Sequence, residues 1–493
     1  MEHRSRALLT HAVLALTQDA SLTPAERFAL EVLVDLSSVL RCGTAGDVVR
    51  VVVVGDAHDA TCASLRGREW GISIGDGLVT VERTLLRFVA DVVGAESEQR
   101  STAADDFGRV PARATRPVRE GFEREPVVSA IASALARSAR AAAGRRAFRL
   151  VDPWPNGKSW AAALTHDLDV VEWWPAFTLL RLAELVRNGH VLRAARVAHA
   201  ALKAGRGPVV WSALADVLAA EARHGVRSSW FVLCGRPTIA TARAGDLTYR
   251  PDAPAARRIF GALADAGHEI GLHGSFVTSD DHAQFVAQRE TLRKLARTDA
   301  VGVRQHYLRM RAATTPRGMA AAGFLYDSTH GFADRNGFRL GVADVVPLWD
   351  AERQARVGVD EVPFVWMDRA LSKYQHVEEP KAWIEDALFL ADRCREVNGL
   401  WVGIWHPNLA PPLGFPDAPA AYERLVAEIV SRDAHVAPLA ELVAWRRIRR
   451  LLRGRVIGEG TGVIVTAGGS ETVAHQFTIR DAAGRVDTAI QEG

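Results

Sequence analysis

The stretch Ala163-Leu-Thr-His-Asp-Leu-Asp169 is an apolar run that ends abruptly in two acidic residues, Asp167 and Asp169. The run is typical of a buried strand, and parallel α/β folds open their functional sites at the carboxyl ends of their strands. A single D-x-D at a strand end is a turn or a helix cap at least as often as a site. The stretch therefore indicates a functional site only if other strands place polar residues at the same edge of the sheet.

Three further segments end strand-like runs in residues suited to catalysis. Asp265-Ala-Gly-His-Glu-Ile-Gly-Leu-His273 delivers His273, Val303-Arg-Gln-His-Tyr307 delivers a polar cluster, and Leu400-Trp-Val-Gly-Ile-Trp-His-Pro407 presents His406 before a proline. Each segment alone is more often structural than functional. Their occurrence at the ends of successive expected strands predicts one site at the carboxyl edge of a parallel sheet.

The rest of the chain supports a parallel α/β architecture. Short strand-like runs alternate with helical ones from Ser159 to about Trp445, interrupted by one long helical insertion from Val170 to Arg223. In the N-terminal part, Gly71-Ile-Ser-Ile-Gly75 matches the G-x-S-x-G nucleophile elbow. A turn and a second strand follow it instead of a helix, which predicts a hairpin and not a hydrolase serine.

Composition excludes several classes of protein. The 493 residues are 48% hydrophobic and 24% charged, as in soluble multidomain proteins, and 61 Lys+Arg against 58 Asp+Glu leave a net charge of only +3. A net charge this small does not attract nucleic acid or an anionic membrane to the protein as a whole.

Four scattered cysteines predict neither a disulfide framework nor a cysteine zinc site. With neither a signal peptide nor a transmembrane segment in the sequence, we expect a cytoplasmic protein. Its oligomeric state is not predicted.

Together the motifs resemble the polysaccharide deacetylase superfamily, also called the NodB-homology or family 4 carbohydrate esterases. The family motifs T-F-D-D-G, A-T-F-F-V-x-G, G-H-E-I-G-x-H, R-x-P-Y, Y-D-S-S and L-x-x-H-P correspond to Thr165–Asp169, Ser229–Gly235, Gly267–His273, Arg304–Tyr307, Tyr326–Thr329 and Ile404–Pro407. The resemblance covers about residues 158 to 447.

The resemblance implies a deformed (β/α) barrel with a metal ion at the carboxyl ends of its strands. We expect this barrel over residues 158–454. An N-terminal α/β domain of unknown role would precede it over 1–125, followed by a linker and helix over 126–157. A small β appendage would occupy 455–493. The polar stretch from Glu96 to Glu125 is the best candidate for a linker.

The resemblance also implies roles for individual residues. Asp167 would be the general base, oriented by Arg304, and His406 the general acid. Tyr307 would offer its backbone N–H to the oxyanion. Candidate substrate contacts are Asp334, Arg339 and Trp405.

The metal ligands implied by the family are Asp169 and His273, and a third is missing. The family's H-x-x-x-H motif has Val277 at its second position here. A catalytic ion needs about three protein ligands. His306, which stands where the family has proline, is the first candidate, and His166 and His282 are the alternatives. His306 could instead bond Asp327 and only shape the pocket. Zinc fits an Asp/His ligand set best, with cobalt or nickel as alternatives.

These residues predict a metal-dependent hydrolase that removes N-acetyl groups from an amino sugar or polysaccharide. Two alternatives stay open. The substrate could be a small non-carbohydrate amide, since a fold does not determine function. The barrel could also be a non-catalytic glycan-binding module. The absent second histidine favours this module, whereas the retained Asp167, Asp169, Arg304 and His406 argue against it. The expected partner is a carbohydrate or small amide, and not nucleic acid.

Overall fold

The structure is a computed structural model of the 493-residue chain. It describes residues 11–16, 21–39, 48–144, 147–148, 150–171, 176–204, 209–238, 249–377, 379–457, 462–467, 479–480 and 486–487. Within these ranges, every helix is too short or too polar to traverse a lipid bilayer.

A curled parallel sheet forms the centre of the larger part of the molecule. Its strand order is β12-β13-β11-β10-β9-β8-β7-β15-β14, and all neighbours in this order except β12 and β13 run parallel. The strands are β7 (Ala161–Leu168), β8 (Ser229–Leu233), β9 (Glu269–Gly274), β10 (Gly302–Gln305), β11 (Tyr326–Asp327), β12 (Val346–Asp350), β13 (Ala355–Glu361), β14 (Trp366–Met367) and β15 (Leu400–Ile404). The path is open between its end strands β12 and β14. The predicted deformed (β/α) barrel is therefore confirmed.

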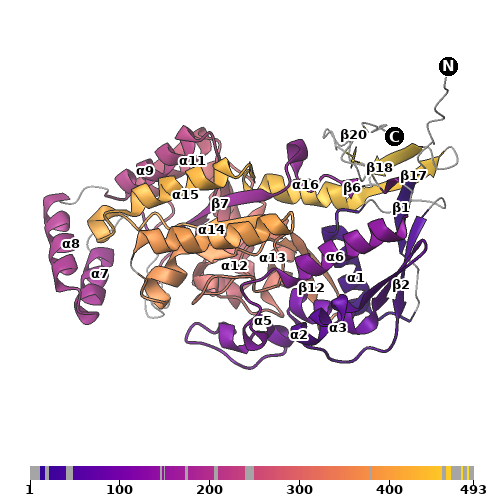
Figure 1. Ribbon diagram of the computed structural model, residues 1–493. Coiled ribbons are helices and arrows are strands. Elements are labelled where there is room, and N and C mark those ends of the chain that lie inside the picture. Colours follow the sequence, from indigo (N-terminus) through magenta and orange to yellow (C-terminus); the bar gives the residue numbers. More distant parts are fainter. Residues whose placement is uncertain are drawn as a thin grey trace, which may run out of the picture.

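Helices cover the outside of this sheet, as Figure 1 shows for α9, α11, α14 and α15. The covering helices are α9 (Val209–Arg223), α11 (Pro254–Asp265), α12 (Ala283–Ala296), α13 (Thr315–Ala321), α14 (Pro380–Glu396) and α15 (Ala418–Ser431). The predicted insertion between β7 and β8 is helical as expected. It begins with the hairpin of α7 (Ala176–Arg187) and α8 (Val191–Ala204), which projects from the end of the barrel far from the N-terminal sheet (Figure 1).

Strand β7 shows how the sheet aims the side chains of the first motif. Ala162 and Leu164 join the core between sheet and helices, whereas Ala161 and Ala163 join the core inside the barrel. Successive side chains of a strand point to opposite faces. Asp167 therefore points into the barrel. His166 points outward, where its ring stacks on that of Trp230 with the ring centroids 4.1 Å apart.

The N-terminal part is built on a second sheet of order β3-β4-β2-β1-β5. Its strands are β1 (His11–Leu16), β2 (Val48–Val54), β3 (Ile72–Gly75), β4 (Leu78–Glu82) and β5 (Ala147–Phe148), and its main helices are α1 (Pro24–Leu36), α3 (Arg83–Val93) and α6 (Val127–Ala142). Antiparallel pairing of β3 with β4 confirms the predicted hairpin at Gly71–Gly75 and leaves no nucleophile elbow there.

The two parts share a hydrophobic core. The ring of Phe28 in α1 stacks on Trp349 of β12 with 4.7 Å between ring centroids, and Leu340 and Val342 pack into the same cluster. The polar stretch 96–125, expected as a linker, contains the short helices α4 (Glu96–Gln99) and α5 (Arg116–Glu120). It also makes specific contacts with the barrel, which are described below.

The C-terminal end follows helix α16 (Leu439–Leu451), which buries Trp445 and Arg446. Strands β17 (Leu452–Ile457) and β18 (Gly462–Ala467) pair antiparallel, and β19 (Ile479–Arg480) pairs with β20 (Val486–Asp487) and with β6 (Leu150–Val151). The remainder of the predicted appendage at 455–493 lies outside the described residues.

Candidate active site

A cavity of about 180 Å³ opens at the carboxyl edge of the parallel sheet. The predicted site residues that line it are Asp167, Asp169, His273, His306, Tyr307 and His406. They come from the ends of β7, β9, β10 and β15, as the order of the motifs predicts. The sheet register explains the convergence, because His273 of β9 lies directly beside Arg304 of β10.

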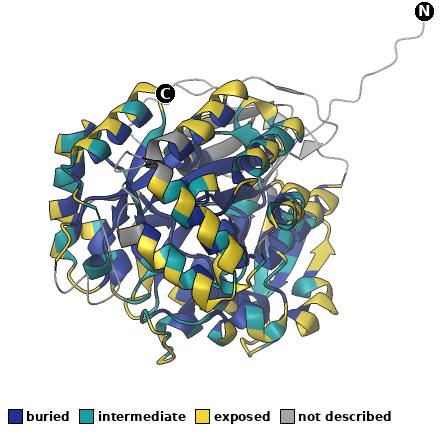
Figure 2. Cartoon of the chain, turned by 90° about the vertical axis from the view of Figure 1, so that its left-hand side faces the viewer, coloured by how far each residue is buried: buried dark blue, intermediate teal, exposed yellow. Residues whose placement is uncertain are grey.

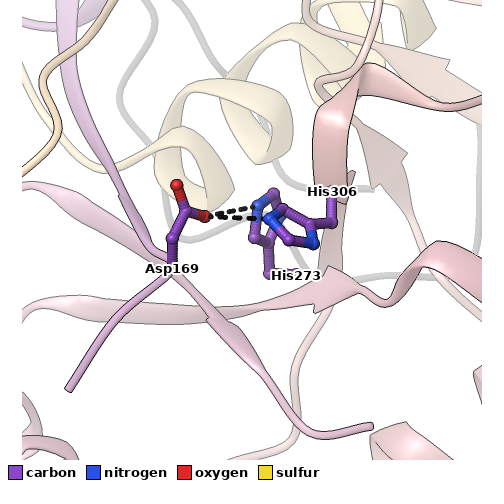
Figure 3. Close-up of side chains that lie close together, drawn as sticks. All are labelled: Asp169, His273 and His306. Atoms are coloured by element: carbon purple, nitrogen blue, oxygen red, sulfur yellow. Dashed lines mark ion pairs between the residues drawn. The ribbon is translucent and has the colours of Figure 1, made fainter. Parts of the chain in front are cut away.

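The side chains of Asp169, His273 and His306 lie close together at the site (Figure 3). Oδ1 of Asp169 lies 3.3 Å from Nε2 of His273 and 3.5 Å from Nε2 of His306. This oxygen is buried and, among the described residues, makes no well-aligned hydrogen bond. Burial opposes ionisation of Asp169, but the three nearby histidines, His273, His306 and His406, hold the pKa of its carboxyl well below the usual range.

The orientation of His273 suits a metal ligand. Its Nδ1 lies 2.9 Å from the backbone oxygen of Arg304. Donation to that oxygen leaves a lone pair on Nε2, which is the atom that faces Asp169. One ligand atom from each of Asp169, His273 and His306 lies within 4.8 Å of the other two. One carboxylate and two imidazoles form a donor set that fits zinc.

The two alternative ligands lie elsewhere. His166 is buried on the outer face of β7, with Nδ1 at 2.8 Å from the backbone oxygen of Trp405 and Nε2 at 3.0 Å from Glu221. His282 precedes helix α12 and stacks on Phe285. Of the three candidates, only His306 stands beside Asp169 and His273.

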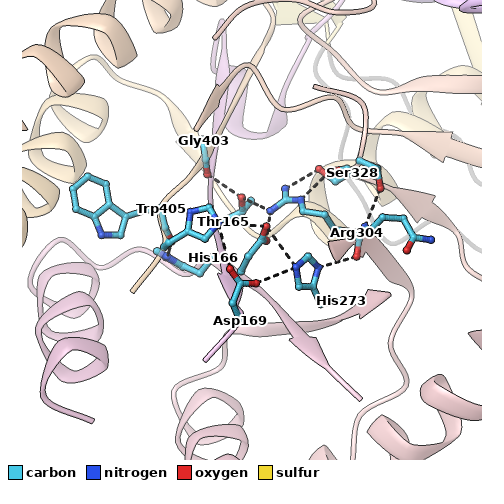
Figure 4. A network of polar contacts seen from close by, with 12 residues as sticks. Thr165, His166, Asp169, His273, Arg304, Ser328, Gly403 and Trp405 are labelled. Atoms are coloured by element: carbon cyan, nitrogen blue, oxygen red, sulfur yellow. Dashed lines mark hydrogen bonds and ion pairs between the residues drawn. The ribbon is translucent and has the colours of Figure 1, made fainter. Parts of the chain in front are cut away.

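Asp167 is held by Arg304, a fully buried arginine that Figure 4 shows between Thr165 and Ser328. Nη1 of Arg304 donates to Oδ1 of Asp167 at 2.8 Å and to the hydroxyl of Thr165 at 2.9 Å. Ser328 fixes the other side of the guanidinium, whose Nε and Nη2 donate to its backbone and hydroxyl oxygens at 2.8 and 2.9 Å. Burial would raise the pKa of Asp167, yet Arg304, His273 and His406 lower it below its usual value.

His406 is held in the same manner by a carboxylate that we did not predict from the sequence. Asp368 accepts the backbone N–H of His406 and approaches its Nδ1, both at 2.6 Å. Nε2 of His406 then faces the cavity, 4.0 Å from Oδ2 of Asp167 and 3.8 Å from Oδ2 of Asp169. Burial would lower the pKa of His406, but Asp368, Asp169 and Asp167 raise it above its ordinary value.

The N-terminal part also reaches the cavity. Arg109, which lines it, donates from Nη1 to the backbone oxygen of Tyr307 at 2.7 Å and from Nε to Asp105 at 2.7 Å. The ring of Phe107 stacks on Tyr307 with 4.9 Å between centroids. Tyr307 has a φ of 59°, a left-handed backbone that is uncommon for a residue with a side chain. The segment 105–109 therefore helps to hold this backbone at the site.

The predicted substrate contacts have different positions. Asp334 adjoins Ala333, which lines the cavity, and its backbone oxygen accepts from Gln375. None of Asp334, Arg339 and Trp405 is among the residues that line this cavity, and their role as substrate contacts stays a prediction. The guanidinium of Arg339 is bound by Glu98 of the N-terminal part. Trp405 is 2% exposed. Its ring packs on Trp366, at the opposite side of the chain from its neighbour His406.

A second buried group, Asp327, His330 and Glu361, also brings ligand atoms within 4.8 Å of one another. These residues do not line the cavity of the site. Burial and the neighbouring carboxylate raise the pKa of Asp327 well above its usual value, and burial raises the pKa of Glu361 to about 8. Both shifts favour the protonated form of these two buried carboxyl groups.

The chain is similar to several solved structures. A protein from Mycobacterium smegmatis described as a polysaccharide deacetylase has 24% identity over 62% of this chain and 96% of its own, with a TM-score of 0.41. One from Pseudomonas aeruginosa PAO1 with the same description has 18% identity over 60% of this chain and 94% of its own, also with a TM-score of 0.41. The allantoinase Puue has 14% identity over 59% of this chain and 92% of its own, with a TM-score of 0.40.

No family model matches the chain, and no curated protein matches it. At these levels of identity and structural overlap, the assignment of chemistry depends on the geometry of this chain's own site.

Proposed function

We propose that the protein is a metal-dependent hydrolase that removes N-acetyl groups from an amino sugar or polysaccharide. The proposal rests on one observation. Ligand atoms from Asp169, His273 and His306 share a cavity with two further groups. These groups are the carboxylate of Asp167, bound by Arg304, and the imidazole of His406, bound by Asp368. Hydrolysis of an amide needs an activated water, a polarised carbonyl and a proton for the leaving nitrogen.

Asp169, His273 and His306 would hold the metal ion, with zinc the best match to these donors. The bound ion supplies a Lewis acid for the acyl oxygen and lowers the pKa of a water molecule to about 7. Oδ1 of Asp169, Nε2 of His273 and Nε2 of His306 support this assignment, since Oδ1 lies 3.3 Å from the first nitrogen and 3.5 Å from the second.

Asp167 would take the proton from the attacking water. Its Oδ1 is fixed by Arg304, which leaves Oδ2 toward the cavity, 3.9 Å from Nε2 of His273. Its lowered pKa keeps the carboxylate ionised at neutral pH, as a base must be. Arg304 acts through Asp167 by fixing the direction of its free oxygen.

His406 would protonate the departing amine. Its raised pKa favours the protonated imidazole that a general acid needs, and Asp368 fixes Nδ1 so that Nε2 is the donor toward the cavity. Tyr307 would offer its backbone N–H to the developing oxyanion, with its carbonyl anchored by Arg109.

The direct test is acetate release from N-acetylglucosamine oligomers by the purified protein, with and without removal of metal by a chelator. We expect release that is lost on chelation and restored by zinc. Hydrolysis of small cyclic amides in place of the oligomers would support the alternative amide hydrolase. Stoichiometric sugar binding with no hydrolysis in any metal state would support a binding module and refute the proposal.

A further inference from the structure

The hairpin of α7 and α8, which projects from the barrel in Figure 1, carries many exposed apolar side chains. Figure 2, in which this side of the molecule faces the viewer, shows many exposed positions. Of the twelve exposed large apolar side chains among the described residues, six lie on these two helices. They are 53% to 81% exposed and comprise Leu179, Leu180, Val186, Val191, Leu192 and Leu202. A solitary exposed leucine needs no explanation, but such a concentration on one projection does.

The exposed side chains form stripes along the helices. Leu179 and Val186 are seven residues apart on α7, and Val191 and Leu202 are eleven apart on α8, so each pair shares one side of its helix. Other positions serve the contact inside the hairpin, where Leu185, Ala194 and Val197 form a small buried cluster. The apolar stripes are therefore not used by the hairpin's own core.

The hairpin is also strongly basic. Residues 176–204 contain one acidic residue, Glu184, and five basic ones: Arg181, Arg187, Arg193, Arg196 and Lys203. Their net charge of +4 exceeds the +3 of the whole chain, so the rest of the protein is slightly acidic. The exposed Arg196 follows the exposed Leu192 by four residues, so the two share one side of α8. Apolar stripes bordered by basic side chains are typical of helices that lie in a membrane interface.

The basic surface continues from the hairpin toward the catalytic cavity. A cavity of about 410 Å³ lies beside α7 and is lined by Arg181, Arg187, Arg369 and Lys373. It shares Leu180, Arg369 and Lys373 with the cavity of the site. Glu184 also lines this cavity, and the charges of Arg369 and Lys373 help to lower the pKa of its carboxyl. The basic side chains around the cavity outnumber this one carboxylate, which favours an anionic ligand.

We propose that the α7–α8 hairpin is a docking surface for an anionic lipid bilayer. Its leucine and valine side chains would enter the boundary between headgroups and acyl chains, and its basic side chains would bind lipid phosphates. Charge complementarity selects this partner, because the surface combines apolar stripes with a local net charge of +4. Docking would hold the catalytic cavity beside the lipid surface.

The test is cosedimentation of the full-length protein with lipid vesicles. We expect binding to vesicles of phosphatidylglycerol and phosphatidylcholine, little binding to pure phosphatidylcholine, and weaker binding as salt is raised. The double variant Leu192→Glu, Leu202→Glu should bind the anionic vesicles about tenfold more weakly or not at all. Val286→Glu, which changes an exposed valine on α12, is the matched control and should bind like wild type.

A second variant pair separates charge from folding defects. Arg196→Glu with Lys203→Glu should lose binding to the anionic vesicles, and melting curves of all variants should match wild type. The proposal fails if wild type binds neither type of vesicle, or if the leucine variant binds as tightly as Val286→Glu. It also fails if wild type is a dimer that the leucine variant dissociates, because a second copy would then cover the stripes.

Discussion

Nε2 of His306 lies 3.5 Å from Oδ1 of Asp169, the oxygen that also faces Nε2 of His273. The two imidazoles come from the ends of adjacent parallel strands, β9 and β10, whereas the motif that the chain resembles takes both from one segment. Val277 stands where that second histidine would be. The end of the neighbouring strand β10 thus places the imidazole of His306 beside the carboxylate of Asp169.

Replacing Asp167 should separate catalysis from metal binding. We expect Asp167→Asn to lower turnover by about 10²–10⁴, because the neutral amide cannot accept a proton from water. Metal content measured on the same preparation should stay near that of wild type. Asp169→Asn, two positions along the chain, should lose metal. Loss of metal from Asp167→Asn would show that Asp167 is itself a ligand.

Replacing Asp368 should shift the alkaline limb of the pH profile. The carboxylate raises the pKa of His406, and the general acid works only while protonated. In Asp368→Asn the pKa of His406 falls, so kcat/KM should begin to decline at a lower pH than in wild type. Asp392→Asn, on the outer helix α14, is the control. An alkaline limb at the same pH in both variants would contradict the general-acid role of His406.

Arg109 should link the N-terminal part to substrate binding. Its charged hydrogen bond to the backbone oxygen of Tyr307 is worth about 1.5–3 kcal/mol, so Arg109→Ala should weaken kcat/KM about tenfold or more. The exposed Arg113→Ala, on the same segment, serves as the control. Steady-state kinetics identical in the two variants would show that residues 105–109 are irrelevant to the site.

Stability should fall with rising pH because of Glu361. Its folded-state pKa of about 8 lies above the ordinary value of 4.5, so the folded protein holds a proton that the unfolded chain releases. The stabilisation is full below about pH 4.5 and is lost as the pH rises to about 8, by on the order of 5 kcal/mol. Melting curves between pH 5.5 and 8.5 should show this decline in wild type and a smaller one in Glu361→Gln. Parallel declines would contradict the raised pKa of Glu361.

Strand-end positions explain why much of the site could be predicted from the sequence. Asp167, Asp169, His273 and His406 each follow an apolar run, and parallel strands bring their carboxyl ends to one edge. The same signal was available for Asp368, which follows the apolar run ending in Met367. The short strand β14 concealed it, because two residues give no alternating pattern.

The alternation of side chains along a strand gives information about Trp405, but none about the contacts of Arg339 and Arg109. Trp405 and His406 are adjacent, so in extended chain only one of them can face the cavity. This alternation could have excluded Trp405 once His406 was chosen. No local pattern could have revealed the pairing of Arg339 with Glu98 or of Arg109 with Tyr307, since both depend on how two separate sheets pack together.

The central claim is that His306 completes a metal site with Asp169 and His273. It is tested most directly by the metal content of the purified wild-type protein and of His306→Ala after equilibration with zinc, with His282→Ala as the histidine control. We expect about one zinc ion per chain in wild type and in His282→Ala, because the site has three protein ligands. We expect His306→Ala to lose most of its bound zinc. Full zinc occupancy in His306→Ala would contradict it.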